Sequence, residues 1–103
     1  MLKIVKNPTF RVEAVLNVPT DEGIVEQSVQ AKFRMLASED LIDGNFAQFV
    51  DRALIDVSGI EDENGKSLDW TDAVKKQCMQ FPWFFMGLFN AYAHALNGNK
   101  LGN

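Results

Sequence analysis

The first residues that could do chemistry are Gly65-Lys66-Ser67, which follow an acidic segment. This order ends the phosphate-binding loop G-x-x-x-x-G-K-[ST], in which backbone amides and the lysine hold phosphate. The first glycine of that motif would fall at position 60, which is Ile60, and Gly59 is one residue out of register. The residues between are acidic and would repel phosphate. We therefore expect no nucleotide site in this segment.

The same segment has some of the residues of a calcium-binding loop, because Asp62 and Asn64 precede Gly65. Such a loop needs a glutamate at its twelfth position to bind the ion through both carboxylate oxygens. The stretch from Ser67 to Asp72 supplies no glutamate. The pair Asn64-Gly65 is instead typical of a tight turn, so we expect a solvated turn without a metal ion.

His94 and Cys78 are the chain's one histidine and one cysteine. A zinc site would need further ligands of these types. Acid–base catalysis by His94 would need an orienting partner, and Cys78 would need a neighbouring base to become a nucleophile. The apolar surroundings of Cys78 favour a buried small side chain instead. With no acidic pair at a recognisable catalytic spacing, we expect a non-enzymatic protein without a cofactor.

Composition narrows the class of protein further. The 103 residues suit one domain, and 47% apolar with 23% charged residues is ordinary for a globular chain. The net charge of −4 argues against nucleic-acid binding, which requires a basic surface. The longest apolar run is short of the roughly 20 residues of a membrane span, and Asn90 and His94 interrupt it. The first eight residues hold too short an apolar run for a signal peptide, which favours a cytoplasmic location.

Among the elements that would position these residues, a helix from Phe81 to Gly98 dominates. Pro82 is well placed at a first helical position, and Asn97-Gly98 is typical of a helix end. At helical spacing its main apolar face comprises Phe81, Phe85, Leu88, Phe89, Tyr92 and Leu96. A narrow strip remains for water and comprises Trp83, Gly87, Asn90, His94 and Asn97. We expect such a helix to be buried on most of its surface, by the chain's own core and by a partner.

The first third of the chain predicts an antiparallel hairpin. Thr9 to Val18 alternates between apolar and polar residues, as a half-buried strand does. After a turn at Pro19–Gly23, the stretch from Ile24 to Leu36 alternates again. The residues expected on the inner face are Phe10, Val12, Ala14, Leu16, Val18, Val25, Val29, Ala31, Phe33 and Met35.

The middle of the chain predicts two shorter helices. One opens at Ala37–Asp40 with Ser38 as its N-cap, or begins later and covers Asn45 to Leu54, because Gly44 weakens the first turn. Its apolar stripe comprises Ile42, Phe46, Phe49, Val50 and Ala53. Ile55–Ile60 suits a brief strand. A second helix starts at Thr71-Asp72, capped by Thr71 or Asp69, with Val74, Cys78 and Phe81 on its inner face.

Strands that precede helices in this way indicate an α+β fold in a single domain over residues 1–103. We expect an N-terminal antiparallel β-hairpin, or small sheet, at about residues 9–36. The helical part, at about residues 38–98, adds three or so helices packed on one face of it.

The order of several short motifs resembles the tail assembly chaperones of long-tailed bacteriophages and prophages. The opening Lys3-Ile4-Val5-Lys6-Asn7-Pro8-Thr9-Phe10 is similar to their K-x-x-x-N-P-T-F-like start. The segment from Gly59 to Leu68 is similar to their turn of pattern G-hydrophobic-x-D-E-x-G-K-x-L, and Tyr92–Leu96 to their terminal Y-x-x-A-L. The aromatic run Trp83-Phe84-Phe85 and Gly44 depart from the usual pattern without contradicting it.

This resemblance implies a non-enzymatic role in the host bacterial cytoplasm. Such chaperones coat the long, aggregation-prone tape-measure protein and help recruit tail-tube subunits around it. Many are made in two forms, the longer by ribosomal frameshifting. The competing interpretations are a structural minor tail or head–tail connector subunit retained in the virion, and a small enzyme or ligand-binding domain with a polar pocket at His94 or Cys78.

For the protein contacts themselves, the final helix is the expected site. We predict Trp83, Phe84 and Met86 as contact residues, since tryptophan and methionine are enriched in interfaces, with Asn90 and His94 beside them. The alternative is that all three apolar side chains are buried in the monomer. We also expect a homo-oligomer, formed through this helix or through a free edge of the hairpin's second strand.

Overall fold

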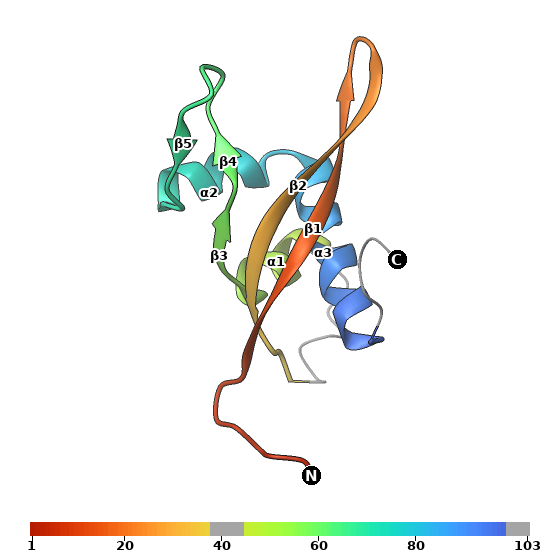
Figure 1. Ribbon diagram of the computed structural model, residues 1–103, viewed down its shortest axis with the longest axis vertical. Coiled ribbons are helices and arrows are strands. Elements are labelled where there is room, and N and C mark those ends of the chain that lie inside the picture. The colour runs from red at the N-terminus through yellow and green to blue at the C-terminus, as the bar shows by residue number, and fades with distance from the viewer. Residues whose placement is uncertain (38–44, 99–103) are drawn as a thin grey trace.

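A long antiparallel hairpin runs through the computed structural model, which describes residues 1–37 and 45–98 (Figure 1). Strand β1 (Thr9–Thr20) pairs with strand β2 (Gly23–Arg34) over the full length of both. Thr20 lies opposite Gly23, so the loop is only Asp21-Glu22 and the expected turn at Pro19–Gly23 is too long. Pro19 is accommodated inside β1 because β1 is an edge strand, where a missing N–H is tolerated.

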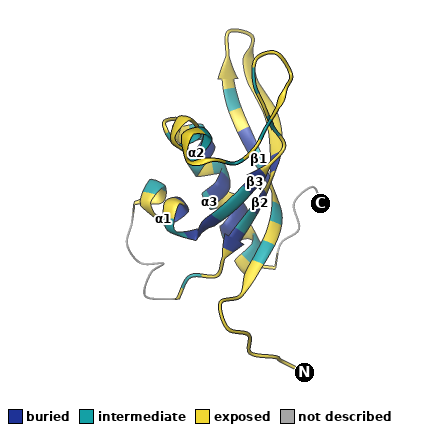
Figure 2. Ribbon diagram, turned by 90° about the vertical axis from the view of Figure 1, so that its left-hand side faces the viewer, coloured by how far each residue is buried: buried dark blue, intermediate teal, exposed yellow. Residues whose placement is uncertain are grey.

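The predicted alternation of the hairpin is confirmed along most of its length. Ala14 and Leu16 on β1, and Val29, Ala31 and Phe33 on β2, are all buried on one face. Two inner positions differ from the prediction: Val25 and Met35 are 42% and 43% exposed. Val25 lies towards the tip of the hairpin, which projects past the helices (Figure 2), so no other element covers it.

A third strand makes the hairpin into a sheet. Strand β3 (Leu54–Ser58) pairs antiparallel with β2 from Gln30 to Phe33, in the strand order β1-β2-β3, with a register shift at Lys32/Phe33. The brief strand expected at Ile55–Ile60 is thus real, but it makes β2 the central strand. The predicted free edge of β2 is therefore wrong for its C-terminal half, and it holds only for the half near the hairpin tip.

Two short helices and a second, small hairpin follow the expected order. Helix α1 (Phe46–Ala53) is capped by Asn45, which matches the later of the two predicted starts, while the predicted cap Ser38 lies outside the described residues. Strands β4 (Ile60–Glu61) and β5 (Ser67–Leu68) enclose the predicted acidic turn. Helix α2 (Asp72–Met79) starts at Thr71, whose side chain accepts a hydrogen bond from the Val74 N–H at 3.2 Å.

The last helix, α3 (Pro82–Leu96), has the predicted start and end, but its buried face is rotated. Phe84, Leu88, Ala91 and Tyr92 form that face, whereas Phe81 and Leu96 are nearly half exposed. Gly87, expected to face water, lies against β1 instead. Packing against the sheet explains this rotation. The side of the helix that carries Gly87 and Ala91 has small residues, so it lets the helix approach the sheet more closely than its phenylalanines would.

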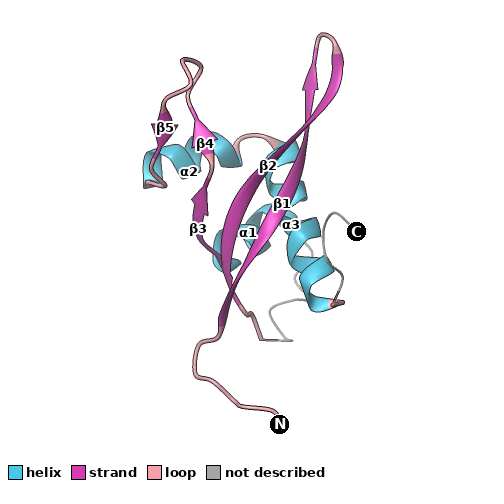
Figure 3. Ribbon diagram, in the orientation of Figure 1, coloured by secondary structure: helices cyan, strands magenta, loops and turns pink. Residues whose placement is uncertain are grey.

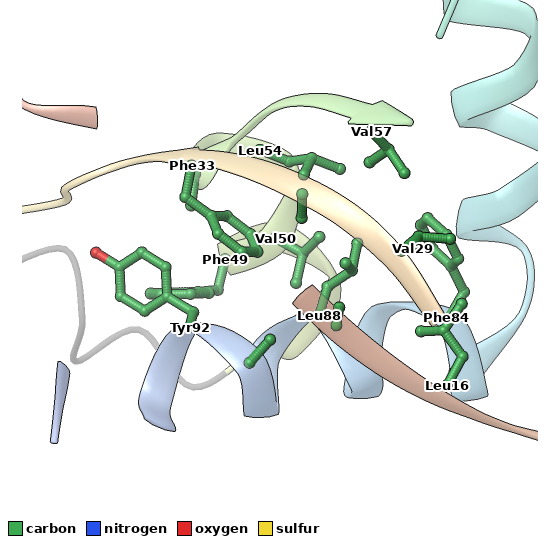
Figure 4. Packing of buried hydrophobic residues seen from close by; sticks show 14 residues of the cluster. Leu16, Val29, Phe33, Phe49, Val50, Leu54, Val57, Phe84, Leu88 and Tyr92 are labelled. Atoms are coloured by element: carbon green, nitrogen blue, oxygen red, sulfur yellow. The ribbon is translucent and has the colours of Figure 1, made fainter. Parts of the chain in front are cut away.

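The helices cover one face of the sheet, which confirms the α+β prediction (Figures 2 and 3). Tyr92 is the centre of the core at one end (Figure 4), with its ring 4.9 Å from that of Phe49 and 5.3 Å from those of Phe10 and Phe33. Its hydroxyl accepts a hydrogen bond from the Leu36 N–H at 2.9 Å. Aromatic pairs in such edge and tilted arrangements add to the free energy of burial.

Candidate functional site

A groove of about 740 Å³ opens at the end of the core nearest the β1–β2 hairpin tip. Its walls are Gln27–Val29 of β2, the β4–β5 hairpin, α2 and the turn between α2 and α3. Leu16 and Val29 of the sheet, with Trp83 and Phe84 of α3, give it an apolar floor. An apolar groove that reaches the surface, with a polar edge, is typical of a site for a ligand or a partner chain.

The rim of the groove is acidic. Glu61, Asp62 and Glu63 line it, and the described residues of its lining include no lysine or arginine. Asp62 also builds the turn, because its Oδ1 accepts hydrogen bonds from the N–H groups of Asn64 at 2.9 Å and Lys66 at 3.0 Å. The segment that shares residues with a phosphate or calcium loop therefore has a structural explanation, and its exposed carboxylates at Glu61 and Glu63 would suit a partner of positive charge.

Strand β2 lines the groove at Gln27, Ser28 and Val29, where Gly59 lies against Ser28 and Val29, and its edge is open from Gln27 back to Gly23. Strand β3 pairs with β2 only from Gln30 onwards, and Gly59 then turns the chain away into β4. Gly59 has a φ of +93°, which residues with a Cβ rarely adopt, so the sequence places this divergence at a glycine. Along the described sheet, this half of β2 carries no second neighbouring strand.

A second candidate surface is the solvent-facing side of α3. It presents Met86, Asn90 and His94, three of the predicted contact residues, and Met86 is 47% exposed. The sequence has no Asp, Glu, Lys or Arg between Lys76 and Lys100, so α3 carries no side chain of these four types. The structure thus brings these three side chains to one uncharged helix surface.

The two remaining predicted contact residues lie elsewhere. Trp83 is half-buried at the groove, where its ring stacks on that of Phe81 at 5.1 Å between centroids. Phe84 is only 2% exposed and belongs to the core, so its expected role as a surface contact is corrected (Figure 4). The helical rotation that buries Phe84 also explains why Met86 is exposed.

The candidate catalytic residues do not come together in one site. Cys78 lines the groove from α2, whereas His94 lies near the end of α3 and is not among the groove residues. Burial raises the pKa of the Cys78 thiol. Within residues 1–37 and 45–98, no group of three or more His, Cys, Asp or Glu side chains is arranged to hold a metal ion.

No protein-family model, curated protein or solved structure matches this chain. The resemblance to tail assembly chaperones therefore depends on the sequence motifs alone. In the described part of the chain, no helix has the length and apolar character needed to cross a membrane.

The N-terminal segment is a further feature, which the sequence analysis does not predict. Residues 1–8 form an exposed arm that leaves β1 at the end of the molecule opposite the β4–β5 hairpin (Figure 1). Its apolar residues are Met1, Leu2, Ile4 and Val5. The signal in the sequence is this group of apolar residues, which is interrupted only by Lys3 and is followed by Lys6.

Proposed function

We propose that this protein is a non-enzymatic tail assembly chaperone, which binds the tape-measure protein in the host bacterial cytoplasm and helps recruit tail-tube subunits. The sequence motifs support the family, and the uncharged, exposed side of α3 is the observation that carries the binding role. An exposed helix surface usually bears charged side chains, whereas depletion of charge marks the centre of a protein interface.

The surface suits a helical client. Met86 offers a flexible apolar contact that adapts to different partners, and Asn90 and His94 offer hydrogen bonds around it. A long helix with an apolar stripe can pack along such a surface without leaving a buried charge unpaired. The chain's net charge of −4 keeps a complex of many copies from aggregating.

The alternative is a minor tail or connector subunit that stays in the particle. It would use the same uncharged surface for a permanent contact with neighbouring subunits. The two functions differ in the fate of the chain: a chaperone is absent from purified tails, whereas a structural subunit is present in each of them.

The test is co-expression with the long helical tape-measure protein encoded nearby, followed by pull-down and mass determination. We expect the client to become soluble and to co-purify with several copies of this chain. Met86→Asp should reduce the co-purified client about tenfold, because it places an unpaired charge in the contact. A client that stays insoluble with wild-type chain would refute the chaperone function.

A matched control separates this effect from added charge in general. Gln48→Asp adds one acid at an exposed position of a different helix, α1. We expect it to leave client capture unchanged. Finding the chain in finished tails, by mass spectrometry of purified particles, would favour the structural-subunit alternative.

A further inference from the structure

The N-terminal arm is turned away from the sheet by its own backbone. Asn7 has a φ of 52°, in the left-handed region that is uncommon for residues other than glycine, and Pro8 follows it. The carbonyl of Pro8 accepts a hydrogen bond from the Met35 N–H at 2.9 Å, which fixes the base of the arm at the end of β1. The arm therefore leaves the domain in a defined direction instead of continuing β1.

The arm exposes apolar surface for which the monomer offers no cover. Leu2 is 86% and Ile4 94% exposed, and Figure 2 shows the whole arm as exposed. The arm is apolar at Leu2, Ile4 and Val5, and the β-branched Ile4 and Val5 favour an extended strand. Such a segment gains free energy when a partner buries its apolar side and pairs its backbone.

We propose that residues Leu2–Lys6 of one copy dock as an added strand in the groove of a second copy, beside the open half of β2. This inference does not depend on the proposed chaperone function. In this arrangement the groove contacts another copy of the same chain, and the α3 surface stays available for a client.

The backbone of β2 supports this mode of binding. Antiparallel strands direct alternate peptide groups to either side, so the open edge between Gly23 and Gln27, which meets the groove at Gln27, offers donors and acceptors to an incoming strand. Binding by strand addition obtains affinity from these main-chain hydrogen bonds and selectivity from pockets for alternate side chains. In an extended arm Leu2, Ile4 and Lys6 lie on the same side, and the two apolar side chains of that side can face the apolar floor at Trp83 and Val29.

Charge complementarity selects the arm over other segments. Lys3 and Lys6 bring two positive charges, and the rim of the groove presents Glu61, Asp62 and Glu63. In the described part of the chain the arm is the exposed apolar stretch that also carries lysines. An acidic groove would repel most other segments of a chain whose net charge is −4.

The geometry favours a second copy over docking within one chain. The arm joins β1 at Thr9, which lies opposite Arg34, whereas the groove begins at Val29, five residues further along β2. That separation is about 17 Å at the rise of a strand. Leu2 is seven residues from Thr9 and can reach at most about 25 Å from it. Most of the arm would be needed to cover the separation, and few residues would remain to pair with β2. The arm also starts from β1, which lies on one side of β2, whereas the open edge of β2 is on the other side, where β3 lies.

The experiment is sedimentation equilibrium on the full chain and on two charge-swapped variants, Lys3→Glu/Lys6→Glu in the arm and Glu61→Lys/Glu63→Lys in the rim. The four positions are exposed, so folding should be unaffected, as circular dichroism would verify. We expect wild-type chain to self-associate, and each variant alone to associate about tenfold more weakly, since attraction becomes repulsion at the exposed rim.

Mixing the two variants is the decisive step. The acidic arm of the first fits the basic rim of the second, so the mixture should recover association towards the wild-type level. A strictly monomeric wild-type chain, or variants that associate as wild type does, would overturn the proposal. A mixture that stays as weak as its components would also overturn it, whatever the result of client capture.

Discussion

A Cβ atom built on Gly87 of α3 would lie 2.6 Å from the Cδ2 atom of Leu16 on β1. It would also lie 2.9 Å from the backbone carbonyl oxygen of Val15, which cannot move as a flexible side chain can. The helix therefore approaches the sheet as closely as a glycine permits.

We predict that Gly87→Ala lowers the free energy of unfolding. Overpacking against backbone costs about 1–3 kcal/mol, more than the roughly 1 kcal/mol that alanine gains in helix propensity. Urea unfolding followed by tryptophan fluorescence measures the difference. Asn90→Ala, on the exposed side of the same helix, is the matched control and should be neutral or slightly stabilising. A stabilised Gly87→Ala variant would contradict the observed closeness of helix and strand.

Gly87 also shows where the sequence was informative and where it was not. Period-two alternation predicted the inner face of the hairpin, and Pro82 and Gly98 predicted the limits of α3, because these signals are local. The orientation of α3 was not predictable, since an almost wholly apolar helix gives no polar face to define it. Its approach to β1 at Gly87, a tertiary contact, decided that Phe84 is buried and Phe81 is exposed.

The groove could not be predicted from the sequence, for a related reason. Its residues come from both sheets, α2 and α3, and although Gly59 permits the turn, a lone glycine does not indicate that β3 separates from β2 there. The acidic turn was predicted as a turn, but its place on the rim depends on that separation. Of the predicted contact residues, Trp83, Met86, Asn90 and His94 keep accessible surface in the structure, and their role remains a prediction.

A second prediction concerns the hydroxyl of Tyr92. Tyr92→Phe removes the acceptor of the Leu36 N–H and the donor to the Met35 sulfur at 3.6 Å, without changing the ring packing. An unsatisfied, partly buried N–H costs about 1–3 kcal/mol, so unfolding should require less urea. Hydrogen exchange measured by NMR should show faster exchange of the Leu36 amide. If that amide exchanges as in the wild-type chain, the hydrogen bond does not protect it.

A third prediction concerns the start of α1. Asn45 Oδ1 accepts a hydrogen bond from the Gln48 N–H at 3.1 Å, and α1 is a helix of only 8 residues. Asn45→Ala should lower the free energy of unfolding by about 1 kcal/mol, whereas Asn45→Asp keeps the acceptor and should be neutral. Equal losses in both variants, measured by urea unfolding, would mean that the cap is not what stabilises this end of the helix.

The last prediction concerns the pH dependence of Cys78. Burial raises the pKa of its thiol, because the apolar surroundings disfavour the thiolate. The thiolate is the reactive form, so alkylation by iodoacetamide should reach its half-maximal rate at a higher pH in the folded chain than in the chain unfolded in urea. Cys78 is the only cysteine, and the rate therefore reports this one group.

The midpoint of that profile separates two causes of slow reaction. Steric hindrance in the groove would reduce the rate by the same factor at every pH and leave the midpoint unchanged, whereas desolvation moves the midpoint upwards. The raised pKa also means that the folded state is penalised once the pH exceeds the ordinary value of a thiol, since the unfolded chain ionises first. Stability should thus fall slightly at alkaline pH in the wild-type chain and less in Cys78→Ala. Coincident midpoints in the folded and unfolded chains would contradict the desolvation of Cys78.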